Sequence, residues 1–161
     1  MTMHGGLVFQ GSVTGRAADL DFKGHLQGTN IEVKLDNSFD TQIDSLVADA
    51  EYSFDSGLAI ATSTIERGTA VLNVSGTLRP RREVSKRGTA TYVWDGGTSV
   101  DADVKLTNAQ LTDVLQMVGQ QQIPVTGEIA TTAHVAGALD DLNGEGEISL
   151  KKGVAYGDSY E

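Results

Sequence analysis

The stretch VDADVKL at residues 100–106 decides the fold, because apolar and charged residues alternate along it without a break. Successive side chains of a β-strand point to opposite faces, so this stretch predicts a strand with one apolar face and one solvated face. The same two-residue period recurs in IEVKL at 31–35, AVLNVSGTL at 70–78, ATYVW at 90–94 and EISL at 147–150. Strands of a buried parallel sheet would be apolar on both faces. The alternation therefore predicts an all-β, antiparallel protein.

Composition limits how such a sheet can be covered. The chain has 161 residues, with 19 Gly, 2 Pro and only 6% aromatic residues, so it has few large side chains to fill a thick core. The strand pattern alone leaves a closed β-sandwich, packed by the same apolar residues, as an alternative architecture.

One segment departs from the two-residue period and predicts a short amphipathic helix at about residues 108–118. Thr107 and Gln110 resemble a capping box, and Pro124 prevents continuation. A weaker helical pattern occurs at 41–48, where Ile43, Leu46 and Val47 have helical spacing. The apolar face of the first helix consists of Leu111, Val114, Leu115 and Val118.

A weak internal repeat relates residues 5–28 to residues 127–150. Val13 matches Val135, and Leu26 matches Ile148 at the same offset without a gap. Repeats indicate stacked units, so the whole chain, residues 1–161, is interpreted as one β-rich fragment of a longer repeat protein. The alternative is that two β-hairpins with similar turns look alike by chance.

The sequence contains no motif that predicts catalysis, a metal site or a cofactor, so we expect no enzyme. His4, His25 and His134 have no metal-ligand spacing, and no Cys is present. The acidic segment at 140–147 has Leu139 where a calcium loop needs an acidic first residue, so a solvated turn is the favoured interpretation. A net charge of −10 argues against a nucleic-acid partner.

The segment from Pro124 to Gly157 resembles the repeat of the AsmA-like and TamB-like bacterial envelope proteins. It joins an alternating strand, the motif Val135-Ala136-Gly137, an aspartate-containing turn and a second strand that ends in Gly153-Val154-Ala155-Tyr156-Gly157. The resemblance covers most of the chain and is best from Ala109 to Tyr156. It implies a curved, open antiparallel sheet with an apolar concave face. It also implies a periplasmic location within an inner-membrane-anchored protein.

The resemblance further implies a non-enzymatic function: sheltering phospholipid acyl chains between the inner and outer membranes, with an outer-membrane protein as a second partner. The alternating apolar residues agree with this, since an unfilled apolar concavity suits acyl chains. The helix is expected to close one end of the groove or pack under the sheet. The expected groove wall consists of Ile31, Val33, Leu35, Leu72, Val74, Leu78, Tyr92, Val100, Val104, Leu106, Ile129, Val135, Ile148 and Leu150.

A basic cluster around Pro80 supplies candidate contacts for anionic lipid headgroups, although an exposed loop is the simpler interpretation. The cluster consists of Arg79, Arg81, Arg82, Lys86 and Arg87. A different class of function also fits the strand pattern. In that alternative the chain is a structural or adhesin-like extracellular β-domain that binds protein or glycan.

Overall fold

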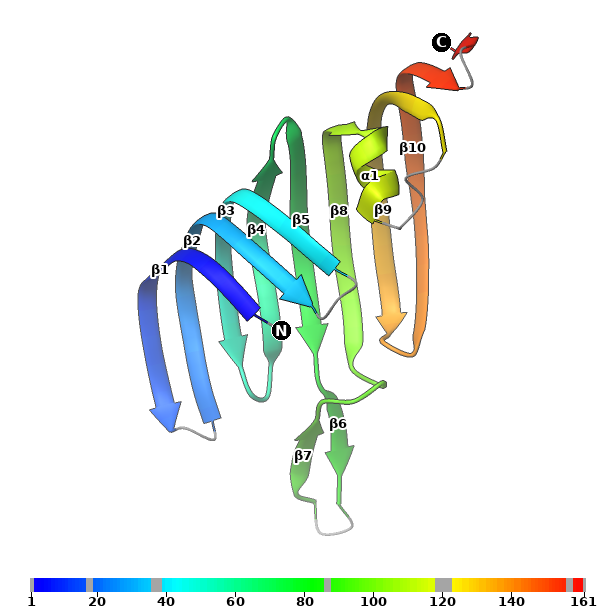
Figure 1. Ribbon diagram of the computed structural model, residues 1–161. Helices are drawn as coiled ribbons and strands as arrows, with labels where there is room; N and C mark the ends of the chain where they lie inside the picture. Colours follow the sequence, from blue (N-terminus) through cyan, green and yellow to red (C-terminus); the bar gives the residue numbers. More distant parts are fainter. Residues whose placement is uncertain are drawn as a thin grey trace.

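The computed structural model describes residues 2–16, 19–35, 39–85, 88–117, 123–155 and 158–160. Almost all of this part of the chain is β-strand, with one short helix (Figure 1). The elements are β1 (Thr2–Arg16), β2 (Asp19–Leu35), β3 (Phe39–Ser53), β4 (Gly57–Arg67), β5 (Ala70–Arg79), β6 (Arg81–Val84), β7 (Ala90–Val93), β8 (Ser99–Gln110), α1 (Leu111–Met117), β9 (Val125–Ala138), β10 (Asp141–Ala155) and β11 (Asp158–Tyr160).

Nine strands form one antiparallel sheet in the order β1-β2-β3-β4-β5-β8-β9-β10-β11, while β6 and β7 form a separate hairpin. The order is linear and the sheet does not close on itself. No second sheet layer covers it in the described part of the chain, where Ile31, Ala48 and Ala109 are the buried apolar residues. The open antiparallel sheet predicted from the sequence is thus confirmed, and the closed sandwich is wrong.

The sheet is folded along a line of backbone kinks. Asn30, Asn108 and Lys152 have positive φ angles of 49°, 55° and 53°, which is unusual for non-glycine residues. In β2 the kink interrupts the alternation, so that Ile31 lies on the same face as Gly28, where a Cβ would collide with the Ile31 side chain. Figure 1 shows the halves of β1, β2 and β3 nearest the N label sweeping back over one face of the sheet. This fold makes that face concave.

The helix is shorter than predicted. β8 continues through Asn108 to Gln110, and α1 covers Leu111–Met117 only, so residues 107–110 form no helical cap. α1 packs against β8 and β9 at the end of the sheet away from the β9–β10 turn (Figure 1). Of its predicted face, Leu111 and Leu115 are half-buried, whereas Val118 and the Val114 side chain lie outside the described part.

The weaker helical pattern at 41–48 is a strand, within β3. Ile43 pairs with Ile31, and Leu46 pairs with Gly28. Ile31 and Gly28 lie on either side of the Asn30 kink in β2. Because Ile31 and Gly28 lie on one face of β2, their partners Ile43 and Leu46 lie on the same side of the sheet although they are three residues apart. A kinked strand therefore imitates the spacing of a helix.

The two hairpins assigned to the internal repeat have the same register. Val13 pairs with Phe22 in β1–β2, and the residues 122 positions later, Val135 and Gly144, pair in β9–β10. The pairing also shifts at equivalent places, between His4 and Gly6 in one hairpin and between Lys151 and Val154 in the other. The kinks correspond too, because Asn30 and Lys152 are 122 residues apart. The two hairpins are therefore structural duplicates, which supports the repeat; the longer parent protein stays a prediction.

Candidate functional site

One face of the sheet collects the apolar side chains, and we call it the apolar trough. Its floor consists of rows that run across the strands. One row passes from Val13 and Phe22 through Tyr52, Leu58, Leu78 and Val100 to Leu142. A second row joins Leu46, Ile65, Leu72, Leu106 and Ile148. The register thus places the apolar side chains of neighbouring strands side by side, and together they form one continuous apolar surface.

Most of the predicted wall residues meet in this trough. Pairing in the sheet places Val74 beside Val104, and Ile129 between Ala109 and Leu150. Ile31 is 5% exposed and belongs to the folded-over part of β2. The side chains of Val33 and Leu35 lie outside the described part. The predicted residues that line the described trough are Ile31, Leu72, Val74, Leu78, Val100, Val104, Leu106, Ile129, Val135, Ile148 and Leu150.

Tyr92 is separated from this group. It lies in β7, which pairs only with β6 in the projecting hairpin. The alternation of residues 90–94 predicts a strand correctly, but alternation carries no information about which sheet a strand joins. Tyr92 therefore does not belong to the sheet that forms the trough.

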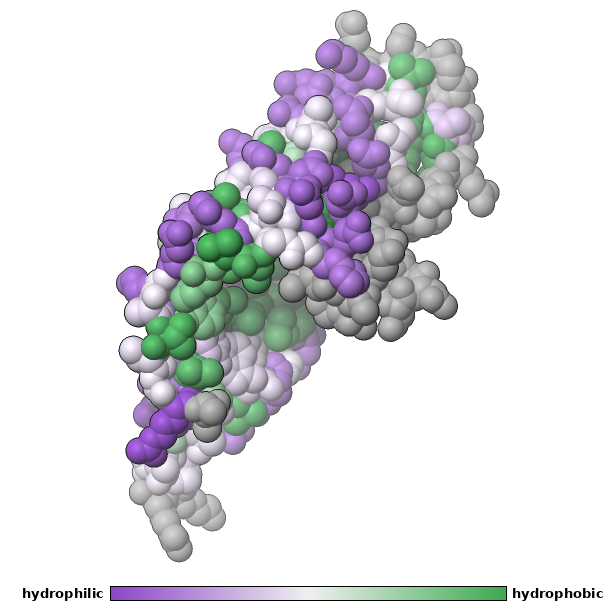
Figure 2. Space-filling view, turned by 60° about the vertical axis from the view of Figure 1, so that its left-hand side comes forward, coloured by the Kyte–Doolittle hydropathy of each residue, from purple (hydrophilic) through white to green (hydrophobic). Residues whose placement is uncertain are grey.

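The trough is open to solvent, and its two edges are the most exposed parts. Val13 is 58% exposed on β1, and Ile148 is 75% exposed on β10. Most apolar residues of the central strands β4, β5, β8 and β9 are half-buried. Figure 2, which brings the β1 side forward, shows green hydrophobic residues gathered around a hollow. A contiguous exposed apolar surface of this kind indicates a binding surface.

Four aromatic rings line one end of the trough, a feature that the sequence analysis missed. Phe9 packs edge-on against Phe22 at 6.2 Å between ring centroids, and Phe22 stacks on Tyr52 at 5.4 Å. Tyr52 in turn lies 6.0 Å from Trp94, the single tryptophan, which follows β7. Strand pairing brings the rings of β1, β2 and β3 together, and the position of the hairpin segment adds Trp94. Trp94 thus brings the segment that follows β7 into contact with the trough.

The predicted basic cluster is only partly available for a ligand. Arg81 forms ion pairs with Asp95 and Glu83, both at 2.7 Å. The hydrogen bond to Asp95, reinforced by the charges of Asp95 and Glu83, raises the pKa of Arg81. Arg79 and Arg82 are exposed, whereas Lys86 and Arg87 lie outside the described residues. The intramolecular pairing leaves two of the three described arginines for an external anion.

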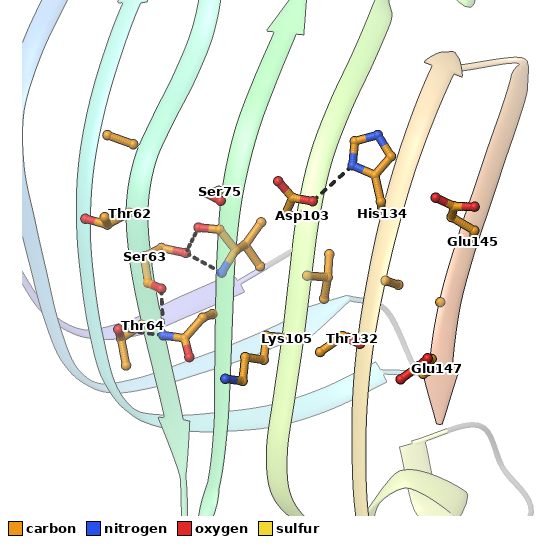
Figure 3. A pocket seen from close by; sticks show the side chains of 16 residues that line it. Thr62, Ser63, Thr64, Ser75, Asp103, Lys105, Thr132, His134, Glu145 and Glu147 are labelled. Carbon is orange, nitrogen blue, oxygen red and sulfur yellow. Dashed lines mark hydrogen bonds and ion pairs between the residues drawn. The ribbon is translucent and has the colours of Figure 1, made fainter. Parts of the chain in front are cut away.

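The opposite face of the sheet is polar and carries a broad, shallow hollow of about 860 Å³. Figure 3 shows the side chains that line it, including Thr62 from β4, Asp103 and Lys105 from β8, and His134 from β9. His134 Nδ1 lies 3.0 Å from an oxygen of Asp103. That hydrogen bond, with further help from nearby acidic charges, raises the pKa of His134. This face therefore has polar side chains that bind one another, in contrast with the uncovered apolar side chains of the trough.

A second histidine follows the same pattern. His25 Nδ1 lies 2.8 Å from Asp49 across β2 and β3, and Thr62 donates a hydrogen bond to the same carboxylate. The bonds from His25 and Thr62 lower the pKa of Asp49. Both histidines are thus explained by cross-strand pairing with aspartate.

Within the described residues, no group of three His, Cys, Asp or Glu side chains is arranged to hold a metal ion. No helix in the same part of the chain is long and apolar enough to cross a membrane. The acidic segment at 140–147 begins in the β9–β10 turn and continues along β10, where its side chains are exposed.

No family model, curated protein or solved structure matches this chain.

Proposed function

We propose that this chain binds the acyl chains of phospholipids along the apolar trough, as a non-enzymatic segment of a periplasmic lipid-transfer protein. The observation that carries the proposal is a continuous apolar face, spanning the sheet from β1 to β10, that no second layer covers in the residues that the structure describes. Removing this surface from water is favourable by about 0.8 kcal/mol for each methylene group buried with it. Such a surface needs no specific polar contact to hold a hydrocarbon chain.

The direction of the trough suits an elongated ligand. Its apolar rows cross eight strands of the sheet, from β1 to β10. Because neighbouring strands lie about 4.8 Å apart, these rows give a surface about 30 Å long. The resemblance to AsmA-like and TamB-like proteins points to the same ligand class and to transfer between two membranes. A role in outer-membrane protein assembly is part of the same proposal.

Trp94 provides a direct test because it is the single tryptophan and lies at the aromatic end of the trough. Purified, delipidated protein is mixed with dioleoyl phosphatidylglycerol or with the same lipid brominated in its acyl chains. We expect a blue shift of Trp94 emission with the first lipid and quenching with the second, because bromine quenches indole only at short range. An unchanged emission spectrum with both lipids, in protein that is folded by circular dichroism, would contradict the proposal.

A matched pair of variants separates the trough from the sheet that carries it. Val104→Asp places a charge in the centre of the trough, whereas Thr132→Asp places one on the polar face beside Lys105. We expect Val104→Asp to abolish quenching and Thr132→Asp to retain it. If both variants bind lipid as the unaltered chain does, the trough is not the binding surface.

The polar hollow favours one alternative, because hydroxyl and carboxylate groups such as those of Thr62, Thr132 and Glu145 suit a glycan or a protein surface. In that alternative the purified protein carries no lipid. Native mass spectrometry of protein purified without detergent distinguishes the two, since a lipid adduct is expected only if the trough is occupied.

A further inference from the structure

The two edge strands of the sheet, unlike the interior strands, have backbone hydrogen-bonding groups that pair with no other strand in the described residues. Within the described residues, β1 pairs only with β2, and β10 is covered on its outer side only where Gly153, Val154 and Ala155 meet β11. Backbone N–H and C=O groups along these edges are free to pair with another strand. Long, regular edges without a covering element are uncommon in soluble proteins, because they invite association.

The duplicated hairpins show that the backbone of β1 is suited to a second neighbour. β9 is the counterpart of β1 at the offset of 122 residues, and β9 is paired on both sides, with β8 and with β10. β8 pairs with β9 from Ala138 as far as Glu128, the residue next to Gly127, so the pairing covers the whole strand up to that irregular position. Gly5 holds the same place in β1.

Strand direction allows the β1 edge and the β10 edge to meet. Every neighbouring pair from β1 to β10 is antiparallel, so β1 and β10 run in opposite directions at opposite edges. A second copy placed with its β1 beside β10 of the first therefore continues the antiparallel sheet, with the apolar faces on the same side. Such a contact is heterologous and repeats head to tail.

One register of the β1–β10 contact pairs exposed side chains of the two edges with partners of matching chemistry. Aligning the turn ends of the strands sets Arg16 of one copy opposite Asp141 of the other, which are opposite charges. The same alignment sets Phe9 opposite Ile148 and Leu7 opposite Leu150. These four apolar residues are 41%, 75%, 52% and 47% exposed in the single chain. Cross-strand apolar pairs of this kind stabilise antiparallel sheets.

Charge also disfavours pairing of two β10 edges. β10 carries Asp141, Glu145 and Glu147 on its polar side, whereas β1 has no acidic residue between Thr2 and Arg16. Two β10 strands would bring like charges together, and a β1–β10 contact does not.

We propose that copies of this chain associate head to tail, the β10 edge of one pairing with the β1 edge of the next, so that the apolar trough continues across the junction. The association depends on the sheet edges and is measured without lipid. Its failure would therefore leave the proposed lipid binding intact, and the reverse also holds.

The absence of cysteine makes a directional cross-linking test possible. In the proposed register Ser12 on β1 lies opposite Glu145 on β10, and both are exposed on the polar face. The single variants Ser12→Cys and Glu145→Cys, one of them carrying an affinity tag that changes its mass, are mixed and treated with a short bismaleimide. We expect the mixed dimer to be the main product. A product made only of two Ser12→Cys chains or two Glu145→Cys chains would show a different pairing and overturn the proposal.

Sedimentation velocity of delipidated protein gives the strength of association. Ile148→Lys places a charge in the apolar part of the junction and should raise the dissociation constant at least about ten-fold. Asn143→Lys places the same charge on the polar face of the same strand and should leave the constant nearly unchanged. A chain that stays monomeric up to its solubility limit would also overturn the proposal.

Discussion

The two faces of the sheet are made by the same strands but are stabilised differently. On the polar face, side chains such as His134 and Asp103, or Lys23 and Glu51, bind one another across neighbouring strands. On the apolar face the side chains line a trough that, in the described part of the chain, no second layer covers, and the apolar residues at its edges remain exposed. The difference teaches that this sheet does not complete a core by itself, and that its apolar face is available for a ligand.

The largest expected effect comes from close strand packing on the apolar side. Gly76 has a φ of 152°, and a Cβ there would collide with the carbonyl oxygen of Asp101 in β8. We expect Gly76→Val to reduce the free energy of unfolding by about 3 kcal/mol, measured by urea denaturation. Gly68→Ala is the control, because its φ of 56° is strained but nothing lies within 4 Å of the added Cβ, so about 1 kcal/mol is expected. Equal losses would mean that the contact with β8 is unimportant.

A smaller loss of unfolding free energy is expected from substitutions in β5, where two positions on opposite faces can be compared. Leu72 is half-buried in the trough between Ile65 and Leu106, so Leu72→Ala should cost about 1–2 kcal/mol of unfolding free energy. Ser75 lies on the polar face, and Ser75→Ala should change stability by no more than about 0.5 kcal/mol. Urea denaturation with a common slope measures both. Bound phospholipid should stabilise the unaltered chain more than Leu72→Ala, since the ligand covers that side chain.

The smallest effect is a pH dependence that belongs to the polar face. The pKa of His134 is raised in the folded chain, so its stabilising contribution is complete below about pH 6.5 and is lost as pH rises through the folded pKa. We expect the NMR titration of His134 to shift to lower pH in Asp103→Asn. Lipid quenching of Trp94 should be the same on both sides of this titration. A parallel loss of lipid binding would show that the two faces are coupled.

Asp49 should respond in the opposite direction. Its pKa is lowered in the folded chain, so its contribution is present above the ordinary carboxyl pKa and is lost as pH falls through the folded value. Thr62→Val removes one of its hydrogen bonds and should raise the Asp49 pKa, which carbon-detected NMR titration can measure. An unchanged value would mean that Thr62 does not hold this carboxylate in solution.

Much of the trough could be predicted from sequence because alternation is a local property. Leu72, Val74, Val100 and Val104 were placed on one face by the two-residue period, and the register confirms that they adjoin one another. The same reasoning failed at Tyr92, whose strand follows the alternation but joins a different hairpin. Alternation assigns a side chain to a face and leaves open which sheet contains that face.

Kinks were the second source of error. Positive φ at Asn30 and Asn108 changes the face that later residues occupy, so strand segments around them resembled helices in the sequence. Asparagine tolerates this backbone region better than most residues, but the same residue also occurs in turns and caps. A sequence pattern alone therefore does not identify where a strand bends.

The antiparallel β class and the polar and apolar sides of most strands follow from the sequence alone, which also indicates a likeness between the two outer hairpins. These follow from backbone geometry over a few residues, in which successive side chains alternate. Three further features are visible only in the folded chain: the sheet stays open, its strands fold over the apolar face, and Phe9, Phe22, Tyr52 and Trp94 meet at one end. Those features depend on pairing between strands distant in sequence and on backbone kinks. Local alternation predicts neither of them.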